Sequence, residues 1–330
     1  MTSDLRVGVL GAARIAPLAI VKPARVVPGV AVTAVAARDR SRAEAFATKH
    51  GIPRVHASYD ELVDDPEIDA VYIPLPNGLH AEWTLKAIAA GKHVLCEKPF
   101  TSNAAEAQQV ADVAEMSDVV VMEAFHYRYH ELAQRMQAVV HDGTIGDVES
   151  VRTWLCFPLP KFSDIRYDYA LAGGATMDCC YPVHAMRLLG PGEPEVVSAS
   201  AKLLGRSEGK IDRAMSTHFR FANGAVGRSE ASMWSHRLLR VAAHVEGTRG
   251  QMKVLNYVAP QIYNSLKVTV NGKTTRERVR GDASYVAQLK AFVAAVRDGT
   301  PFPTTPRDAV VTMRLIDDIY RAAGMPLRGE

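Results

Sequence analysis

Two short segments carry residue types that suit one chemistry. Residues 96–100, CEKPF, place a lysine ammonium group between a carboxylate and a proline after an apolar run, and residues 173–187, GGATMDCCYPVHAMR, open a predicted helix. In that helix Asp178, Tyr181 and His184 follow one another at three-residue intervals, so they share nearly one face. A lysine that meets a phenol, carboxylate or imidazole around one oxygen atom suits proton transfer as a hydride leaves or arrives.

Each of these residues has a chemical role and a structural alternative. Lys98 would hydrogen-bond the reacting oxygen, and the positive charge of an oxidised nicotinamide would lower its pKa. Tyr181, with an unperturbed pKa of about 10, needs an adjacent cation such as Lys98; the alternative is a packed core aromatic. Asp178 would orient a group, bind a substrate hydroxyl or cap its helix. His184 is expected to support the site from behind or to pack in the core, rather than to act as a catalyst.

Length and composition limit the classes of protein to which this chain can belong. With 330 residues, two domains are expected, and 48% hydrophobic and 23% charged residues are ordinary for a soluble globular protein. A net charge of +3 is too small to favour nucleic acid binding. There is no apolar stretch near 20 residues and no signal-peptide pattern, so a cytoplasmic protein without membrane partners is expected. The four cysteines lack metal-ligand spacing and are expected to be buried free thiols, with no metal site.

The N-terminal region reads as the opening βαβ unit of a dinucleotide-binding fold. A valine-rich strand is predicted at residues 5–10, followed by a glycine turn, a helix interrupted by prolines, and a strand at residues 30–36. The Gly-x-Gly-x-x-Gly fingerprint becomes Gly11, Ala13 and Ala16. Gly11 still permits the tight turn, whereas Ala13 narrows the approach to a pyrophosphate. Alone the motif is a weak signal, and an ordinary strand-to-helix turn is the alternative.

The end of the second strand indicates which dinucleotide binds. NAD sites place a carboxylate there for the ribose hydroxyls, whereas an arginine accommodates the 2′-phosphate of NADP. Here Ala37 is followed by Arg38, whose guanidinium can stack on adenine and pair with phosphate. Asp39 is the alternative ribose ligand. The pattern favours NADP, with NAD as the alternative.

Strands and helices continue to alternate. Strands are predicted at residues 69–75, 93–97 and 119–125, with helices at 80–90 and from 102 or 103 onward. This alternation predicts a parallel sheet with helices on both faces and ligands at the carboxyl ends of the strands. Four polar residues fall at such ends: Asn77, His80, Glu97 and Lys98.

From about Gly143 the pattern changes to longer strands with hairpin turns. Asn-Gly pairs at 223–224 and 271–272 favour hairpins between strands, and the region reads as a largely antiparallel sheet. Helices are predicted at residues 284–297 and 307–323. We therefore expect a Rossmann domain over residues 1–125 and an α+β substrate-binding and oligomerisation domain over residues 126–330, whose C-terminal helix could pack back on the first domain.

Taken in order, several motifs resemble those of the Gfo/Idh/MocA oxidoreductases over nearly the whole chain. They are Gly11-Ala-Ala-Arg-Ile-Ala16, Pro76-Asn77-x-x-His80, Glu97-Lys98-Pro99, Glu123-Ala-Phe-His-Tyr-Arg128, Gly173-Gly174-x-x-x-Asp178 and Tyr285-x-x-Gln288-x-x-x-Phe292. The resemblance implies an N-terminal Rossmann domain, a C-terminal domain with an open sheet, and a homodimer or homotetramer formed through one face of that sheet.

Carried over by position, the resemblance makes Lys98 the catalytic lysine. The residues implied to contact the dinucleotide are Gly11, Ala13, Arg14, Ile15, Arg38, Pro76, Asn77, His80 and Glu97. Family members place a histidine or, in the dihydrodiol dehydrogenase branch, a tyrosine four residues after the aspartate. Here that position is Pro182, with Tyr181 at three and His184 at six, so Tyr181 is predicted to transfer the proton.

The prediction is an NADP-dependent oxidoreductase that transfers a hydride between nicotinamide and a hydroxyl or keto carbon of a sugar, keto-sugar or cyclic diol. An NAD-dependent inositol-type polyol dehydrogenase is one alternative. A non-catalytic dinucleotide-sensing regulator is another, although the retention of Lys98 beside a tyrosine argues against it.

Overall fold

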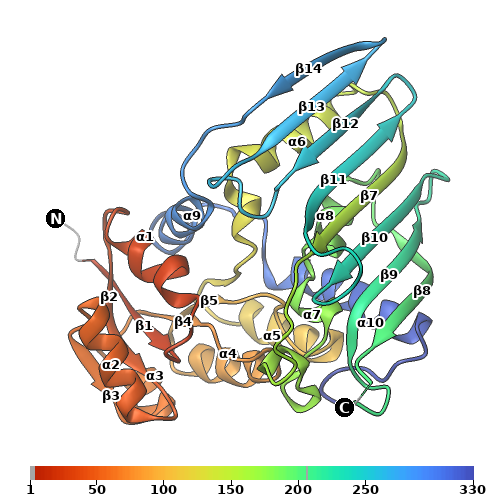
Figure 1. Cartoon of the computed structure of the whole chain (residues 1–330). Coiled ribbons are helices and arrows are strands. Elements are labelled where there is room, and N and C mark those ends of the chain that lie inside the picture. The colour runs from red at the N-terminus through yellow and green to blue at the C-terminus, as the bar shows by residue number, and fades with distance from the viewer. Residues whose placement is uncertain (1–3, 206) are drawn as a thin grey trace. The chain divides into compact units, whose positions relative to one another are not determined.

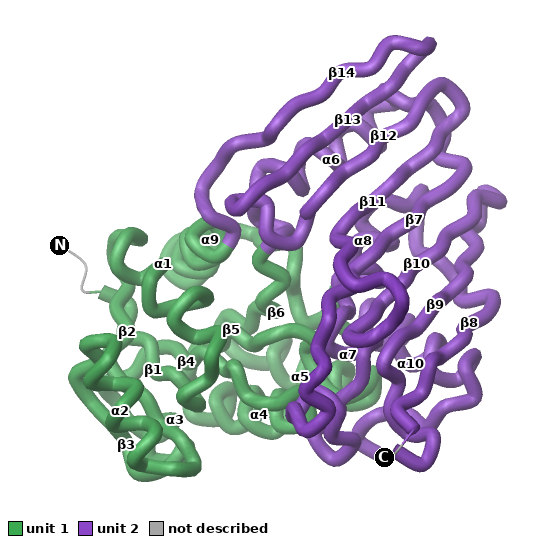
Figure 2. Tube along the Cα trace, viewed as in Figure 1, with its two compact units in different colours: residues 1–126, 285–310 green, residues 127–284, 311–330 purple. Residues whose placement is uncertain are grey.

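The computed structural model describes residues 4–205 and 207–330, which form two compact units (Figure 2). Unit 1 contains residues 1–126 and 285–310, and unit 2 contains residues 127–284 and 311–330. Residues 285–310, which the prediction assigned to the second domain, therefore cluster with the first. Helix α10 (Pro306–Ala322) continues from unit 1 into unit 2.

Unit 1 is built on a parallel sheet in the order β3-β2-β1-β4-β5-β6 (Figure 1). Its strands are β1 (Leu5–Leu10), β2 (Val30–Ala36), β3 (Arg54–His56), β4 (Ala70–Ile73), β5 (His93–Cys96) and β6 (Val121–Glu123). The predicted Rossmann-like sheet is confirmed. The edge strand β3 was missed because three residues, two of them polar, show no periodicity.

Helices connect these strands and begin where the sequence supplies caps. Asn103 accepts a hydrogen bond from the backbone N–H of Glu106, whose carboxylate accepts one from the N–H of Ser102 in return. The two bonds form a reciprocal cap at the predicted start of this helix. The helical segments of this unit are the π-helix Pro17–Val21, α1 (Lys22–Ala24), α2 (Arg40–His50), α3 (Tyr59–Asp64), α4 (His80–Ala89), α5 (Ala104–Glu115) and nearly all of α9 (Ser284–Asp298).

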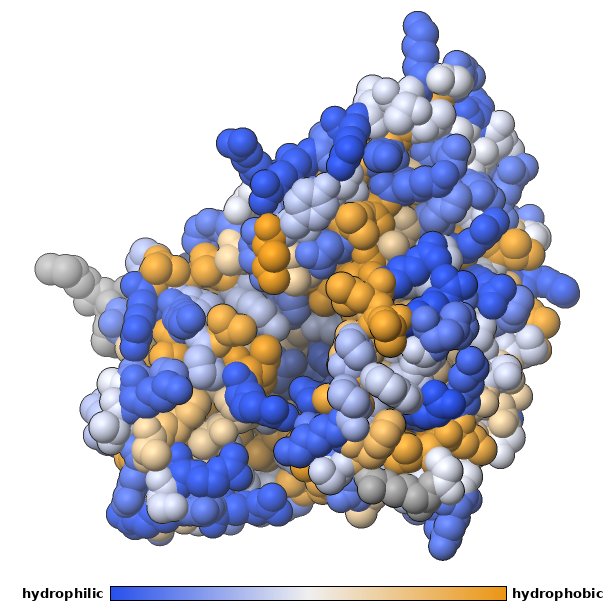
Figure 3. All heavy atoms as spheres, viewed as in Figure 1, coloured by the Kyte–Doolittle hydropathy of each residue, from blue (hydrophilic) through white to orange (hydrophobic). Residues whose placement is uncertain are grey.

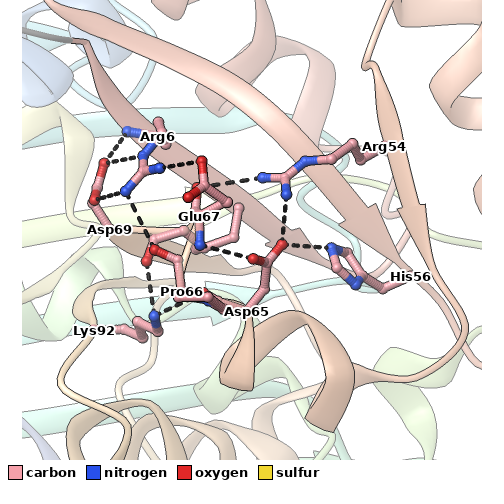
Figure 4. Close-up of polar contacts among 9 residues, drawn as sticks. Arg6, Arg54, His56, Asp65, Pro66, Glu67, Asp69 and Lys92 are labelled. Carbon is pink, nitrogen blue, oxygen red and sulfur yellow. Dashed lines mark hydrogen bonds and ion pairs between the residues drawn. The ribbon is translucent and has the colours of Figure 1, made fainter.

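A network of ion pairs fixes the amino ends of the strands, at the edge of the sheet away from the predicted ligand side (Figure 4). Arg6, on β1, donates to both carboxylate oxygens of Asp69, immediately before β4. Arg54 and His56 of β3 both lie against the Asp65 carboxylate. These contacts tie the short edge strand and the loop before β4 to β1, which suits a structural role.

Unit 2 contains an eight-stranded sheet in the order β14-β13-β12-β11-β7-β10-β9-β8. Only the β7–β10 pair is parallel among the described pairings, so the predicted, mainly antiparallel sheet is confirmed. The Asn271-Gly272 hairpin also forms, with positive φ at both residues. The strands are β7 (Val148–Cys156), β8 (Glu195–Leu203), β9 (Asp212–Arg220), β10 (Val226–Ser232), β11 (Arg240–Gly247), β12 (Gly250–Leu255), β13 (Ser265–Val270) and β14 (Lys273–Glu277). The sequence did not indicate β14 because all five of its residues are polar and exposed.

Helices cover one face of this sheet. Helix α8 (Tyr181–Leu189) packs on β7 and β10, and α6 (Glu131–His141), which was not predicted, packs on α8. The hydroxyl of Thr153 on β7 donates to the Pro182 carbonyl at 2.9 Å, which fixes α8 to the sheet. Short 3-10 turns at Ile165–Tyr167 and Tyr169–Leu171 lead into α7 (Ala175–Asp178), directly before α8.

The surface is mostly polar. On the face visible in Figure 3, hydrophobic side chains form small separate groups among charged ones. Within the described ranges, no helix combines the length and apolar character needed to cross a membrane. The four cysteines are buried free thiols, as predicted, and burial raises the pKa of Cys156 to about 11.

Candidate active site

The predicted site residues fall into two groups, one in each unit. The dinucleotide residues and Lys98 belong to unit 1, and Asp178, Tyr181 and His184 belong to unit 2.

The glycine turn after β1 has the backbone that the fingerprint requires. Gly11 has φ +109, and its N–H donates to the Ala36 carbonyl at 2.7 Å. A Cβ at this position would lie 3.2 Å from the Leu75 side chain, so glycine keeps the turn close to the next loop. Ala16, the third fingerprint position, is fully buried, and Ala13, Arg14 and Ile15 form the more accessible part of the turn.

The two candidate ribose ligands after β2 are Arg38 and Asp39, and their contacts differ. Arg38 is exposed. Asp39 caps helix α2: its Oδ1 accepts from the Ser41 hydroxyl at 2.7 Å and from the Arg42 N–H at 3.3 Å. These bonds, led by that from Ser41, hold the pKa of Asp39 below its ordinary value. Both side chains are exposed, but the Asp39 carboxylate is engaged by its own helix.

His80 ties the loops after β4 and β5 together. Its side chain is fully buried, with Nδ1 2.8 Å from the Pro99 carbonyl oxygen and Nε2 2.8 Å from that of Leu75. Burial, helped by the charge of Lys98, lowers the pKa of His80 to about 4 despite these two contacts. The neutral ring has one N–H, so it donates to one of the two carbonyls. Pro76 and Asn77 lie on the loop that His80 anchors, and both are partly exposed.

Lys98 lies two residues after the end of β5 and is flanked by fixed groups. The Glu97 side chain is buried and accepts a hydrogen bond from the Tyr72 hydroxyl at 2.7 Å, and the Lys98–Pro99 peptide is cis. The ring of His126 is buried and stacks on Tyr285, with ring centroids 4.0 Å apart. Burial and then the charge of Lys98 lower the pKa of His126 to about 3. The Lys98 charge thus acts on two neutral imidazoles, those of His80 and His126.

In unit 2, Asp178 ends the single turn of α7 and pairs with an arginine that the sequence did not single out. Arg166 Nε lies 3.0 Å from Asp178 Oδ1, and Arg166 Nη1 lies 3.2 Å from Asp164 Oδ1. Burial alone would lower the pKa of Arg166, but the carboxylates of Asp178 and Asp164 raise it overall. Asp178 is therefore held as an oriented carboxylate.

Tyr181 opens α8 and belongs to a buried aromatic cluster. Its ring centroid lies 5.7 Å from that of Tyr127, whose hydroxyl is 2.6 Å from His184 Nδ1. The ring of Tyr257 lies 5.5 Å from that of Tyr127, and its buried hydroxyl has no hydrogen-bond partner among the described residues. His184 is thus buried in this cluster and paired with Tyr127.

Three residues carried no usable sequence signal: Arg166, Tyr257 and Arg328. Arg166 lies in the 3-10 turn Ile165–Tyr167, and Tyr257 follows Asn256, which adopts φ +54. Arg328, two positions from the last residue, is fully buried in unit 2. Long-range contacts bring each of them to its place, and neither spacing nor periodicity reports such contacts.

Comparison with known proteins gives the same picture over the whole chain. Residues 5–125 match the model of an oxidoreductase family with an NAD-binding Rossmann fold, and residues 133–253 match the GFO/IDH/MocA C-terminal domain. The chain is 37% identical to D-xylose 1-dehydrogenase (NADP(+)) 2 of Haloferax volcanii, covering 96% of both chains. It is 34% identical to the trans-1,2-dihydrobenzene-1,2-diol dehydrogenase of Mus musculus, covering 73% of this chain and 70% of that one.

A solved structure supports the same assignment. The crystal structure of KijD10, a 3-ketoreductase from Actinomadura kijaniata in complex with NADP and TDP-benzene, matches with a TM-score of 0.89 and 26% identity over 97% of this chain and 98% of that one. The fold, the motifs and these matches together show that the chain is an oxidoreductase of the Gfo/Idh/MocA family.

Proposed function

We propose that this oxidoreductase uses NADP to transfer a hydride to or from a carbon that bears a hydroxyl or keto group in a sugar or a related cyclic diol. The similarity to an NADP-dependent xylose dehydrogenase over 96% of both chains supports the cofactor and the substrate class. The observation that carries the proposal is the Lys98 ammonium at the carboxyl end of β5, where its charge acts on two buried neutral histidines.

The residues of unit 1 fit NADP. The Gly11 turn has the tight backbone conformation that suits a pyrophosphate, with Ala13, Arg14 and Ile15 beside it. Arg38 is exposed for the 2′-phosphate, while Asp39 is occupied as a helix cap. Pro76, Asn77 and Glu97 then belong to the nicotinamide side, and His80 acts there by holding the loops in place.

When bound, NADP supplies the hydride acceptor or, reduced, the hydride donor. In the direction of oxidation, Lys98 donates a hydrogen bond to the reacting oxygen and stabilises negative charge that develops on it. Tyr181, as the phenolate, takes the hydroxyl proton as the C–H bond breaks, and in reduction the neutral phenol returns a proton to the oxygen. Asp178, oriented by Arg166, binds a neighbouring hydroxyl of the substrate.

The direct test is nicotinamide absorbance at 340 nm with a panel of D-xylose, other aldoses, myo-inositol and cyclic diols, each with NADP and with NAD. Turnover is expected with NADP and a sugar or diol. Turnover only with NAD and inositol would favour the polyol dehydrogenase, and binding without turnover would favour a dinucleotide sensor.

Lys98→Ala tests the catalytic assignment. The variant should bind NADP with near-normal affinity by fluorescence titration while its kcat falls by orders of magnitude, because the donor to the reacting oxygen is lost. Near-normal turnover would remove Lys98 from the mechanism. Lys86→Ala is the matched control, since this lysine lies on the surface of α4 and pairs with Asp60.

We also propose a cytoplasmic homodimer or homotetramer formed through the face of the unit 2 sheet that the helices leave open. Directly opposed residues form a basic row across seven strands on that face: His218, Arg228, Arg152, His244, Lys253, Lys267 and Arg276. Glu230 and Glu246 flank the row and pair with Arg228 and Arg152 within one chain. A second copy could offer the same carboxylates to the remaining bases.

Sedimentation velocity tests the assembly. The wild-type chain should sediment as a dimer or tetramer, and Arg152→Glu, at the middle of the basic row, should shift it toward the monomer. Lys49→Glu, on the exposed face of α2 in unit 1, is the control and should leave the distribution unchanged. A monomeric wild-type chain would contradict the assembly without affecting the catalytic proposal.

A further inference from the structure

A buried carboxylate with four donors lies beside the segment that leads to Asp178. Asp212 Oδ2 accepts hydrogen bonds from the backbone N–H and the hydroxyl of Thr176, both at 2.7 Å. Its Oδ1 accepts from the Tyr320 hydroxyl at 3.1 Å and from Arg328 Nη2 at 3.0 Å. Asp212, Tyr320 and Arg328 are fully buried. The donors come from α7, from α10 and from the segment after α10, so Asp212 joins three parts of unit 2.

Arg328 extends this cluster to the backbone of the glycine pair. Its Nε donates to the Gly173 carbonyl at 2.7 Å, and its guanidinium lies 4.0 Å from the Tyr320 ring centroid. The Tyr169 hydroxyl donates to the Leu327 carbonyl at 2.6 Å and holds the same segment from the other side. A guanidinium stays charged when buried, so Arg328 requires the Asp212 carboxylate in this position.

The glycine pair and this cluster exclude any larger residue. A Cβ on Gly174, which has φ +136, would lie 2.3 Å from Asp212 Oδ1 and 2.9 Å from Arg328 Nη2. A Cβ on Gly173 would lie 2.6 Å from the carbonyl oxygens of Arg166 and Asp168. The glycines therefore let the backbone close onto the buried ion pair, which explains their position before Asp178 in physical terms.

The segment held in this way is short and carries the proposed chemistry. Helix α7 is one turn, Ala175–Asp178, and a single turn has little stability of its own, so its direction depends on its anchors. Thr176, held twice by Asp212, is two residues before Asp178, and α8 begins with Tyr181 three residues after Asp178. A shift of the anchor would therefore move the carboxylate and the phenol together.

We propose that Arg328, acting through Asp212 and the Gly173 carbonyl, is a positioning residue that sets the placement of Asp178 and Tyr181 for hydride and proton transfer. This inference rests on the proposed function. It assigns no contact with substrate to Arg328. It predicts that the rate of the chemical step depends on a guanidinium far along the chain, while binding of the dinucleotide in unit 1 does not.

Single-turnover stopped flow separates positioning from simple loss of stability. The experiment compares three proteins, each mixed with NADP and the best sugar substrate: the wild-type chain, Arg328→Lys and Tyr320→Phe. The rate constant of the single turnover reports the geometry of the site, and its amplitude reports the fraction of active protein. Arg328→Lys keeps the charge but loses the fork that reaches both Asp212 and Gly173. We expect its rate constant to fall at least tenfold with near-full amplitude and an NADP Kd within twofold of wild type. Tyr320→Phe should lower the rate constant severalfold.

Arg6→Lys is the matched control, because it loses the two-point pairing with Asp69 at the edge of the unit 1 sheet away from the proposed site. Its rate constant should stay within twofold of wild type. A reduced amplitude with an unchanged rate constant in Arg328→Lys would show a structural role only and overturn the inference. If Arg328→Lys does not fold, an unchanged rate constant in Tyr320→Phe overturns it instead. A wild-type chain without turnover would overturn the proposed function as well.

Discussion

At the scale of residues, the charge of Lys98 acts on two histidines that stay neutral. His80 and His126 are buried, with pKa values lowered to about 4 and about 3. Neutral imidazoles do not compete with the ammonium group for an anionic oxygen, and they add no repulsion when an oxidised nicotinamide brings a further positive charge. The surroundings of Lys98 are thus arranged to carry one cation.

Arg38→Ala tests the proposed contact with the 2′-phosphate. Loss of a guanidinium–phosphate pair should raise the Kd for NADP at least tenfold, about 1.4 kcal/mol, while the Kd for NAD changes by less than threefold. Fluorescence titration measures both. Arg40→Ala is the control, since Arg40 pairs with Glu44 on the same helix. Equal losses for the two dinucleotides would contradict the assignment.

Tyr127→Phe and Tyr257→Phe make a matched pair within one aromatic cluster. The Tyr127 hydroxyl bonds His184 Nδ1 at 2.6 Å, so its removal should lower the free energy of unfolding by about 1 kcal/mol. The Tyr257 hydroxyl is buried without a described partner, so its removal should leave stability unchanged or raise it. Urea unfolding of both variants checks the difference, and equal losses would show that the Tyr257 hydroxyl is satisfied.

At the scale of elements, the segment from Asp178 to Tyr181 differs from the single helix expected from the sequence. Cys179, with φ −99 and ψ 40, ends α7, while Cys180 returns to helical values just before α8. The predicted helix is therefore divided into two, with Asp178 as the last residue of α7 and Tyr181 as the first of α8. Residues three apart share a face only along a continuous helix, so the spacing alone does not fix how these two side chains are directed.

The cap of α5 lies close to Lys98 in the sequence and can be tested alone. Asn103→Ala removes the acceptor for the Glu106 N–H and should lower the free energy of unfolding by about 1 kcal/mol in urea melts. Asn103→Ser keeps an oxygen at this position and should lose much less. If both variants lose the same amount, the capping bond is not what Asn103 contributes.

At the scale of the whole molecule, the sequence predicted what depends on local order. The valine-rich strands, the Asn-Gly hairpin and the capped helix α5 follow from patterns within about ten residues, and each formed as expected. Motif spacing likewise pointed to the family. It could not reveal the Arg166–Asp178 pair or the Arg328–Asp212 pair, because partners 12 and 116 residues apart meet only through the folded topology.

Acid should begin to destabilise the molecule at a pH well above the range in which carboxylates titrate. The pKa values of His80 and His126 fall from 6.5 in the unfolded chain to about 4 and about 3 when folded, so between roughly pH 6.5 and pH 4 these two rings bind more protons in the unfolded state. Burial also lowers the pKa values of His50, His93, His130 and His244, which add to the same loss. Their contribution is complete above pH 6.5 and is lost as the pH falls. The slope should approach about 1.4 kcal/mol per pH unit for each histidine. Asp69, whose pKa is lowered from 3.8 chiefly by the Arg6 hydrogen bond, adds a loss only at lower pH. Urea unfolding at pH 7.5, 6 and 5 measures the slope, and His126→Gln should reduce it by one proton. A flat profile between pH 6 and 5 would mean that neither ring is kept neutral by burial.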